Sequence, residues 1–543
     1  MEAKVTQQKL GEYRADGARR TIFIDFAVIA TCWLLLIATL LSLQELGYDF
    51  GFHVWPIGEV RNWLVFLHEK PGTGAAKLFW AVDNRNALAP WWYLAARPII
   101  QSQPSAFLIL HLVVGLVAGL SGYALLREVL SGHARLFAVS LGALVSLFIV
   151  SIYCDDIIWT QIGALSCTLL SMWTFLRSKA TETNATFWRS LSLVIWLIAL
   201  STYTLQCGAM LGIFALSFFR NENVRFGARA IGRAVLTAAV DAMPYGAVFA
   251  IYYMIWITSS ADSFSPVMNL HFSFAAILKS LSFGIWHSDY LIFWNWARES
   301  GVKVNLLVFT ITAATVLCLL QFVRQPGGRF EFRWWDTFLV LTIGVTVVAP
   351  TILLESSSDI FLPGTRWRMV MQFWAPLLFC TSLLLILIAL PLRERLRSLI
   401  WRAGIAAAAG IAVVLALGFN RTQVIYARAE IRFFDALKSA ISNDRSAGAA
   451  FPRYYLIKLD AISPHYIGSN LELAYVRTVL DPDVRFRTTP LNGPYFGPPI
   501  AFLPSGMTIG NGAPIPYKQI SALVWNGKNL APDRTSWGGE GSP

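Results

Sequence analysis

The segment from Phe79 to Ile100 concentrates side chains that could carry out chemistry on a hydroxyl group. Asp83 stands close to Arg85 and Arg97, among aromatic residues and directly before an apolar stretch. A carboxylate can act as general base on a sugar hydroxyl, and an arginine can bind a phosphate through a bidentate fork. The segment therefore indicates a site where Asp83 activates a hydroxyl and the arginines bind a lipid phosphate. The alternative is that Asp83 pairs with a neighbouring arginine at the membrane interface.

Asp155 and Asp156 form a pair of adjacent carboxylates in a short turn between apolar stretches. Carboxylate oxygens bind divalent cations, and they could equally bind an acceptor hydroxyl. So short a turn holds the pair close to the place where the loop 45–103 would fold down. A solvated turn is the alternative. A divalent cation is thus the only cofactor that the residues suggest, and no metal ligands are assigned.

Arg366 and Arg368 begin an apolar stretch on what is expected to be its outer side, where positive charge is disfavoured. Binding of a lipid-linked phosphate would explain both residues. Pairing with Glu355 or Asp359 is the alternative.

Polar residues inside apolar segments form a further group of candidates. Tyr203 and Gln206 lie where the segment 190–219 is interrupted. Broken helices at membrane depth occur where they line a cavity or are buried in protein, so both residues are expected to line the site or to form structural hydrogen bonds. His287 stands in an aromatic patch and is either a substrate-binding or a packed residue. Asp241 indicates a functional intramembrane carboxylate or a hydrogen bond to a neighbouring helix.

Membrane helices must position these residues. Of 543 residues, 56% are hydrophobic and 14% are charged. A spanning helix needs about 20 apolar residues, so we expect an all-α polytopic membrane protein with about 10–11 transmembrane segments. The stretches without Asp, Glu, Lys or Arg are 26–44, 98–126, 136–154, 157–176, 190–219, 242–261, 304–323, 337–354, 369–392 and 403–420.

Basic residues predict the orientation, because cytoplasmic loops collect Lys and Arg. The N-terminus is rich in both, so we place it in the cytoplasm. The other basic clusters also fall inside if the segment 190–219 forms two short half-helices that meet near residues 201–208. The loops 45–103 and 258–302 and the tail from residue 421 then lie outside.

The chain is expected to divide into a transmembrane domain, 1–420, and a small soluble α/β domain, 421–543, with a helix over 424–441 and strands over 454–457 and 520–525. All six cysteines lie in or beside apolar stretches, so disulfides do not frame the tail. The net charge of +12 comes mostly from residues that set topology, which argues against nucleic acid as a partner. The sequence contains no P-loop, dinucleotide-binding, CxxC or HExxH motif.

The first-loop segment resembles a known motif. It reads Asp83-Asn84…Ala87-Leu88…Trp91-Trp92…Ala96-Arg97-Pro98-Ile99. It looks like the first-loop motif of the bacterial O-antigen glucosyltransferase branch of the GT-C superfamily, an Asp-Asp pair, an aromatic residue and Gly-Arg-Pro-Leu. Asn84 replaces the second Asp, and Ala96 replaces the Gly. The likeness extends to Asp155 and Asp156 before Trp159, to the break between Tyr203 and Gln206, and in topology to most of residues 1–420.

The resemblance implies a GT-C-like fold and an inverting membrane glycosyltransferase. Such an enzyme moves a sugar from a polyprenyl-phosphate donor to a glycan or glycolipid acceptor. Asp83 would be the general base, and some of Arg85, Arg97, Arg366 and Arg368 would bind the phosphate. A metal is less expected because Asn84 removes one carboxylate. The implied location is a bacterial inner (cytoplasmic) membrane, with the C-terminal domain in the periplasm or outside the cell.

Three other classes compete with this hypothesis. A polysaccharide polymerase or ligase would also be polytopic, but its largest loop usually comes later in the chain. A transporter of a lipid-linked glycan would show inverted repeats and ionisable residues near the midplane, whereas the sequence shows no repeat and only Asp241 as an intramembrane ionisable residue. A scaffold would bind a partner through its tail. Mutation of Asp83 alone distinguishes an enzyme from a scaffold.

Overall fold

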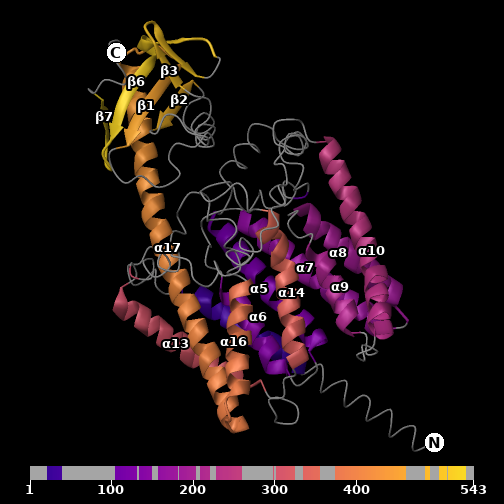
Figure 1. Ribbon diagram of the computed structural model, residues 1–543. Helices are drawn as coiled ribbons and strands as arrows, with labels where there is room; N and C mark the ends of the chain where they lie inside the picture. Colours follow the sequence, from indigo (N-terminus) through magenta and orange to yellow (C-terminus); the bar gives the residue numbers. More distant parts are fainter. Residues whose placement is uncertain are drawn as a thin grey trace, which may run out of the picture.

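The computed structural model contains a bundle of helices and a separate C-terminal domain with strands (Figure 1). It describes residues 21–39, 88, 104–130, 134–148, 157–181, 183–202, 208–220, 228–259, 298, 301–323, 334–354, 373–459, 483–488, 500–509 and 512–533. The helices are Thr21–Thr39, α5 Pro104–Val129, α6 Arg135–Leu147, α7 Ile157–Ala180, α8 Ala185–Thr202, α9 Ala209–Arg220, α10 Ala228–Ser259, α13 Val302–Gln321, α14 Trp334–Leu354, α16 Ala375–Ala389 and α17 Glu394–Ser446.

The apolar stretches of the sequence coincide with these helices. Within the described residues, five helical segments are long and apolar enough to cross a membrane: Thr21–Thr39, Ala185–Thr202, Arg229–Ile255, Val302–Gln321 and Glu394–Gly418. Shorter apolar segments are Arg135–Leu147, Ala209–Phe219, Thr337–Val347 and Ala375–Ala389. The mostly helical class is therefore confirmed, whereas the full number of 10–11 segments stays a prediction.

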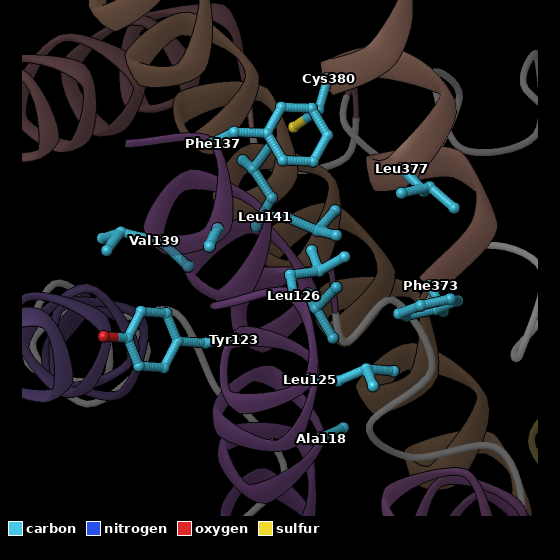
Figure 2. Close-up of a cluster of buried hydrophobic side chains, with 14 of the residues drawn as sticks. Ala118, Tyr123, Leu125, Leu126, Phe137, Val139, Leu141, Phe373, Leu377 and Cys380 are labelled. Carbon is cyan, nitrogen blue, oxygen red and sulfur yellow. The ribbon is translucent and has the colours of Figure 1, made fainter. Parts of the chain in front are cut away.

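Large apolar side chains fill the interior of the bundle. Figure 2 shows Leu126 of α5 close to Leu141 of α6, with Phe137 and Cys380 beyond Leu141 and Leu125 on the opposite side of Leu126. All five side chains are almost completely buried. Because protein interiors are close-packed, substitutions that change the volume of these buried side chains are poorly tolerated.

One end of the bundle gathers basic side chains. Arg135 at the start of α6 contacts Asp25 near the start of the first helix. Arg177 near the end of α7 pairs with Glu128 at the end of α5, with 3.5 Å between their charged atoms. We call this end the basic end, defined by Arg127, Arg135, Arg177, Lys179, Arg189 and Arg402, and the opposite end the far end. The predicted gathering of basic loops at one face agrees with this arrangement.

The segment 190–219 folds as two helices rather than one. Arg189 near the start of α8 and Ser217 near the end of α9 both contact Asp241 of α10, so the chain reverses between α8 and α9. The predicted reversal is confirmed. The prediction of two short half-helices is wrong for α8, because its 18 residues are long and apolar enough to cross a membrane. Only α9, with 12 residues, is short.

The C-terminal domain is layered. Its main sheet has the order β2-β1-β6-β7 and a smaller one the order β3-β4-β5. β1 is parallel to β2 and β6, while β7 is antiparallel to β6. The strands are β1 Arg453–Leu459, β2 Val484–Thr488, β3 Ile500–Leu503, β4 Gly506–Ile509, β5 Ile515–Pro516, β6 Ile520–Trp525 and β7 Leu530–Pro532. Both predicted strands, 454–457 and 520–525, are confirmed as parts of β1 and β6.

The two faces of the main sheet pack against different elements. Tyr455 and Ile457 of β1 pack with the end of α17, whereas Tyr454 and Leu456 pack with the smaller sheet. This division follows from the strand geometry, because successive side chains point to opposite faces. The domain therefore has two small cores, one on each side of the main sheet.

α17 connects the bundle to the domain without interruption. Its 53 residues correspond to a rod of about 80 Å. It starts at the basic end, where Arg402 donates a hydrogen bond to Gln321 at the end of α13. It then passes the far end and enters the domain (Figure 1). The expected helix 424–441 is part of this longer helix, so the boundary expected at residue 421 lies inside it.

Candidate functional site at the far end of the bundle

The predicted site residues lie outside the described part of the chain. They are Asp83, Arg85, Arg97, Asp155, Asp156, Tyr203, Gln206, His287, Arg366 and Arg368. Their mutual distances therefore stay predictions. What the structure provides is the position of the helices that precede or follow them, and one contact made by the first-loop motif itself.

Leu88 contacts the end of α8. Its backbone N–H donates a hydrogen bond to the carbonyl oxygen of Ser201, at 2.9 Å between nitrogen and oxygen. The last four carbonyl groups of a helix have no partner within the helix, so Leu88 satisfies one of these acceptors. Leu88 belongs to the first-loop motif, and Ser201 is the first residue of the interruption at residues 201–208, two residues before Tyr203. The contact therefore joins two segments that the sequence analysis assigned to one site.

The end of α8 is itself shaped by polar side chains. The Ser201 hydroxyl donates to the carbonyl oxygen of Leu197, at 2.5 Å between the two oxygens, and Ser201 and Thr202 are both buried. Hydrogen bonds from serine to the preceding turn often bend a helix and loosen its ladder. This local competition with the helical hydrogen bonds accounts for the end of α8 at Thr202 within an otherwise apolar segment.

The contact at Ser201 is remote from the basic end. Ser201 follows Arg189 by 12 residues, which is about 18 Å along the helix. α7 runs antiparallel to α8, since Lys179 in the last turn of α7 and Arg189 near the start of α8 both contact Asp241, while Ser171 and Ser192 are hydrogen-bonded to each other further along the two helices. The start of α7 and the end of α8 therefore lie at the same, far end of the bundle.

Several of the helices that stand next to the predicted site residues in the sequence begin or end at this end of the bundle. α5, α7, α13 and α16 all run toward the basic end, so their first residues start from the far side. In the sequence, Arg97 precedes α5, the Asp155-Asp156 pair precedes α7, His287 precedes α13, and Arg366 and Arg368 precede α16. Tyr203 and Gln206 follow α8. The C-terminal domain lies beyond the same end (Figure 1).

Asp241 belongs to the basic end and not to this site. Its carboxylate oxygens lie 2.7 and 2.8 Å from Nζ of Lys179, and Oγ of Ser217 donates to Oδ2 at 2.5 Å. Arg189 is further away, at 3.4 Å. Of the two roles weighed for Asp241, bonding to neighbouring helices is confirmed.

A second buried carboxylate was missed in the sequence. Asp25 is fully buried and accepts hydrogen bonds from Arg135 and from the hydroxyl of Tyr123. The available signal was its position directly before the apolar stretch 26–44, where a carboxylate needs a partner. Among the described residues, no group of three His, Cys, Asp or Glu side chains could hold a metal ion.

Comparison with known proteins finds no family model, curated relative or solved structure that matches the chain.

Proposed function

We propose that this protein is a membrane glycosyltransferase of the GT-C type, which transfers a sugar from a polyprenyl-phosphate donor to a glycan or glycolipid acceptor. Its helices would span a bacterial inner membrane, with the basic end in the cytoplasm and the C-terminal domain in the periplasm. The observation that carries the proposal is the hydrogen bond from Leu88 to Ser201. It supports a single site at the far end that includes the first-loop motif and the end of α8.

The chain geometry near Leu88 supports the role of the motif. Asp83 and Arg85 precede Leu88 by five and three residues. A chain extends by at most about 3.6 Å per residue, so the bond at Leu88 limits how far both side chains can lie from the end of α8. A carboxylate and a guanidinium within this reach suit deprotonation of a hydroxyl and binding of a phosphate, respectively.

The proposed reaction needs few groups. Asp83 removes the proton from the acceptor hydroxyl, the acceptor oxygen forms a bond to the anomeric carbon, and the bond from that carbon to the phosphate oxygen breaks. The polyprenyl phosphate leaves as an anion, so protonation of the leaving group is not required. Arg85, Arg97, Arg366 and Arg368 are the candidates that stabilise its charge. The C-terminal domain would hold the acceptor.

The experiment measures release of polyprenyl phosphate by the purified full-length protein from a panel of synthetic polyprenyl-phosphate sugars. We expect release by the wild type and a loss of at least about 100-fold for Asp83→Asn, because general-base catalysis contributes at least this factor. Asp435→Asn, at an exposed position of α17, is the matched control and should behave like the wild type. Full activity of Asp83→Asn would contradict the mechanism.

The hydrogen bond from Leu88 to Ser201 is tested by two substitutions, of which one removes the backbone N–H of residue 88 and the other keeps it. Leu88→Pro removes the N–H that donates to Ser201 and should lower transfer about fivefold or more, since such a bond contributes about 1 kcal/mol. Leu88→Ala keeps the N–H and serves as control. Equal activity of the two variants would show that this hydrogen bond does not position the motif.

In the release experiment, absence of polyprenyl-phosphate release from any donor by the well-folded wild type would instead favour a polymerase or a transporter.

A further inference from the structure

The basic end carries more positive charge around Asp241 than this carboxylate can neutralise. Lys179 and Arg189 both approach Asp241, which is 4% exposed, so two cations share one buried anion. Lys179 comes from the last turn of α7, and Arg189 from the second turn of α8. Their side chains remain 38% and 36% exposed. Counted over these three described side chains, the cluster therefore carries a net positive charge.

Arg189 does not use its N–H donors in a close hydrogen bond to Asp241. Its only approach to Asp241 is 3.4 Å, outside the usual range of 2.7–3.2 Å for a hydrogen bond. Lys179, in contrast, contacts both oxygens of Asp241 at 2.7 and 2.8 Å. A guanidinium has five N–H groups in a fixed fork that fits the oxygens of a phosphate. Asp241 thus holds Arg189 loosely in place and leaves its fork for another anion.

The two helices that carry Arg189 and Asp241 also expose apolar side chains. On α10, Val240 and Met243 lie within one turn of Asp241 and are 53% and 67% exposed. On α8, Val194 and Leu197 are 54% and 43% exposed. Such side chains suit contact with acyl chains rather than with water. An anionic lipid could therefore place its charged group at Arg189 and its acyl chains against the exposed apolar side chains of α8 and α10.

The beginning of α10 extends the same combination. Arg229 and Arg233, one helical turn apart, are exposed, and so are the apolar residues Ile231 and Leu236 between and beyond them. A segment with exposed arginines and exposed apolar residues is typical of a helix at the surface of an anionic membrane. Charge and apolar surface thus occur together on two neighbouring elements.

We propose that Lys179 and Arg189, held by Asp241, form a binding site for the phosphate of an anionic phospholipid in the leaflet at the basic end. The fork of Arg189 binds the phosphate oxygens, and Lys179 adds a second positive charge. The acyl chains lie along the exposed apolar residues of α8 and α10. The site requires insertion of the bundle in a membrane, but it is independent of the transfer reaction and of Asp83.

The test is native mass spectrometry of the full-length protein, titrated with phosphatidylglycerol or with phosphatidylcholine of the same acyl chains. A basic residue near a lipid surface changes binding about fivefold. We therefore expect the wild type to prefer phosphatidylglycerol and Arg189→Gln to bind it about fivefold more weakly. The triple variant Lys179→Gln, Arg189→Gln, Asp241→Asn should lose the preference. It leaves no unpaired buried charge, so it tests binding without the risk of a carboxylate stranded in the bundle.

The control variant removes two positive charges from α17, away from the proposed lipid site. Arg432→Gln with Lys438→Gln, at exposed positions near the C-terminal domain, should bind phosphatidylglycerol like the wild type. A triple variant that still prefers phosphatidylglycerol would overturn the proposal, and so would equal binding of both lipids by the wild type. Inorganic phosphate is added in a third series. Full displacement of the lipid by millimolar phosphate would identify a site for free anions instead and would also overturn the proposal.

Discussion

Asp25 is the residue on which the basic end of the bundle depends most directly. It is fully buried, and its carboxylate accepts hydrogen bonds from Nε and Nη2 of Arg135, the shorter at 2.6 Å. The hydroxyl of Tyr123 donates to the same carboxylate, also at 2.6 Å. Burial of a charge costs free energy unless partners surround it. These contacts join the first helix to α5 and α6.

Asp25→Asn is expected to lower the free energy of unfolding in detergent by about 3–5 kcal/mol, because the guanidinium of Arg135, whose side chain is only 11% exposed, then lacks its counter-charge. Thermal unfolding of the purified protein measures this change. Arg135→Gln alone should also destabilise, and the double variant should cost less than the sum of the two, since both substitutions break one pair. Strict additivity would show that the pair does not act as a unit.

At the scale of elements, α5 and α6 approach each other through glycine. A Cβ atom on Gly142 would lie 2.9 Å from the carbonyl oxygen of Gly119 and 2.9 Å from Cδ1 of Ile29. Small residues let helix backbones come close, and this is a common device of helices packed within membranes. The contact also lies next to Tyr123, whose Cβ would be 3.1 Å away. The helix interface and the Asp25 cluster therefore depend on the same spacing.

Gly142→Ala should destabilise the protein by about 1–3 kcal/mol, because overpacking forces two backbones apart. The matched control is Gly163→Ala on α7, where a new Cβ would meet no atom of the described residues within 4 Å. That substitution should instead stabilise by about 0.5–1 kcal/mol, as alanine is preferred to glycine in a helix. Thermal unfolding compares both variants with the wild type. If both substitutions changed the stability equally, helix propensity and not close packing would determine the effect of Gly142→Ala.

For the whole molecule, α17 is the element that relates the domain to the bundle. Phe433, Leu437 and Ile441 near its end are buried against the main sheet. Asp444, one turn further, accepts hydrogen bonds from Tyr455 at 2.7 Å and pairs with Arg453 at 2.6 Å. A continuous helix with an anchored end carries the domain at a defined height above the far end. This arrangement suits the proposed role of the domain in holding an acceptor.

Leu437→Ala should destabilise the C-terminal domain by about 2–5 kcal/mol, the cost of a cavity at a buried leucine. Limited proteolysis of the full-length protein should then cleave the domain faster while the bundle stays resistant. Lys438→Ala, at the exposed neighbouring position, should change stability by less than about 0.5 kcal/mol. Protease resistance equal to that of the wild type would show that the domain does not depend on α17 for its core.

The sequence predicted the elements well where one local property decides them. Apolar length predicted the helices, and the polar residues around Ser201 predicted the reversal between α8 and α9. The length of α8 was underestimated because a polar interruption marks where a helix stops, not how far its apolar part extends. The candidate site could be predicted only as residue types and as a resemblance, and its ten residues remain predictions at the far end.

By itself, the sequence determined which segments are helices of the bundle and two of the seven strands in the described residues, and that basic residues gather at one end, since apolar length and charge act locally. Only the tertiary structure decided that Arg135 pairs with Asp25, that Asp241 joins four helices, and that Leu88 contacts Ser201. The physical reason lies in the apolar helices. Their lipid-facing and core-facing sides are both apolar, so the periodicity that marks the buried face of a soluble helix is weak. Which faces meet is then decided by packing and by the few polar groups that must find partners.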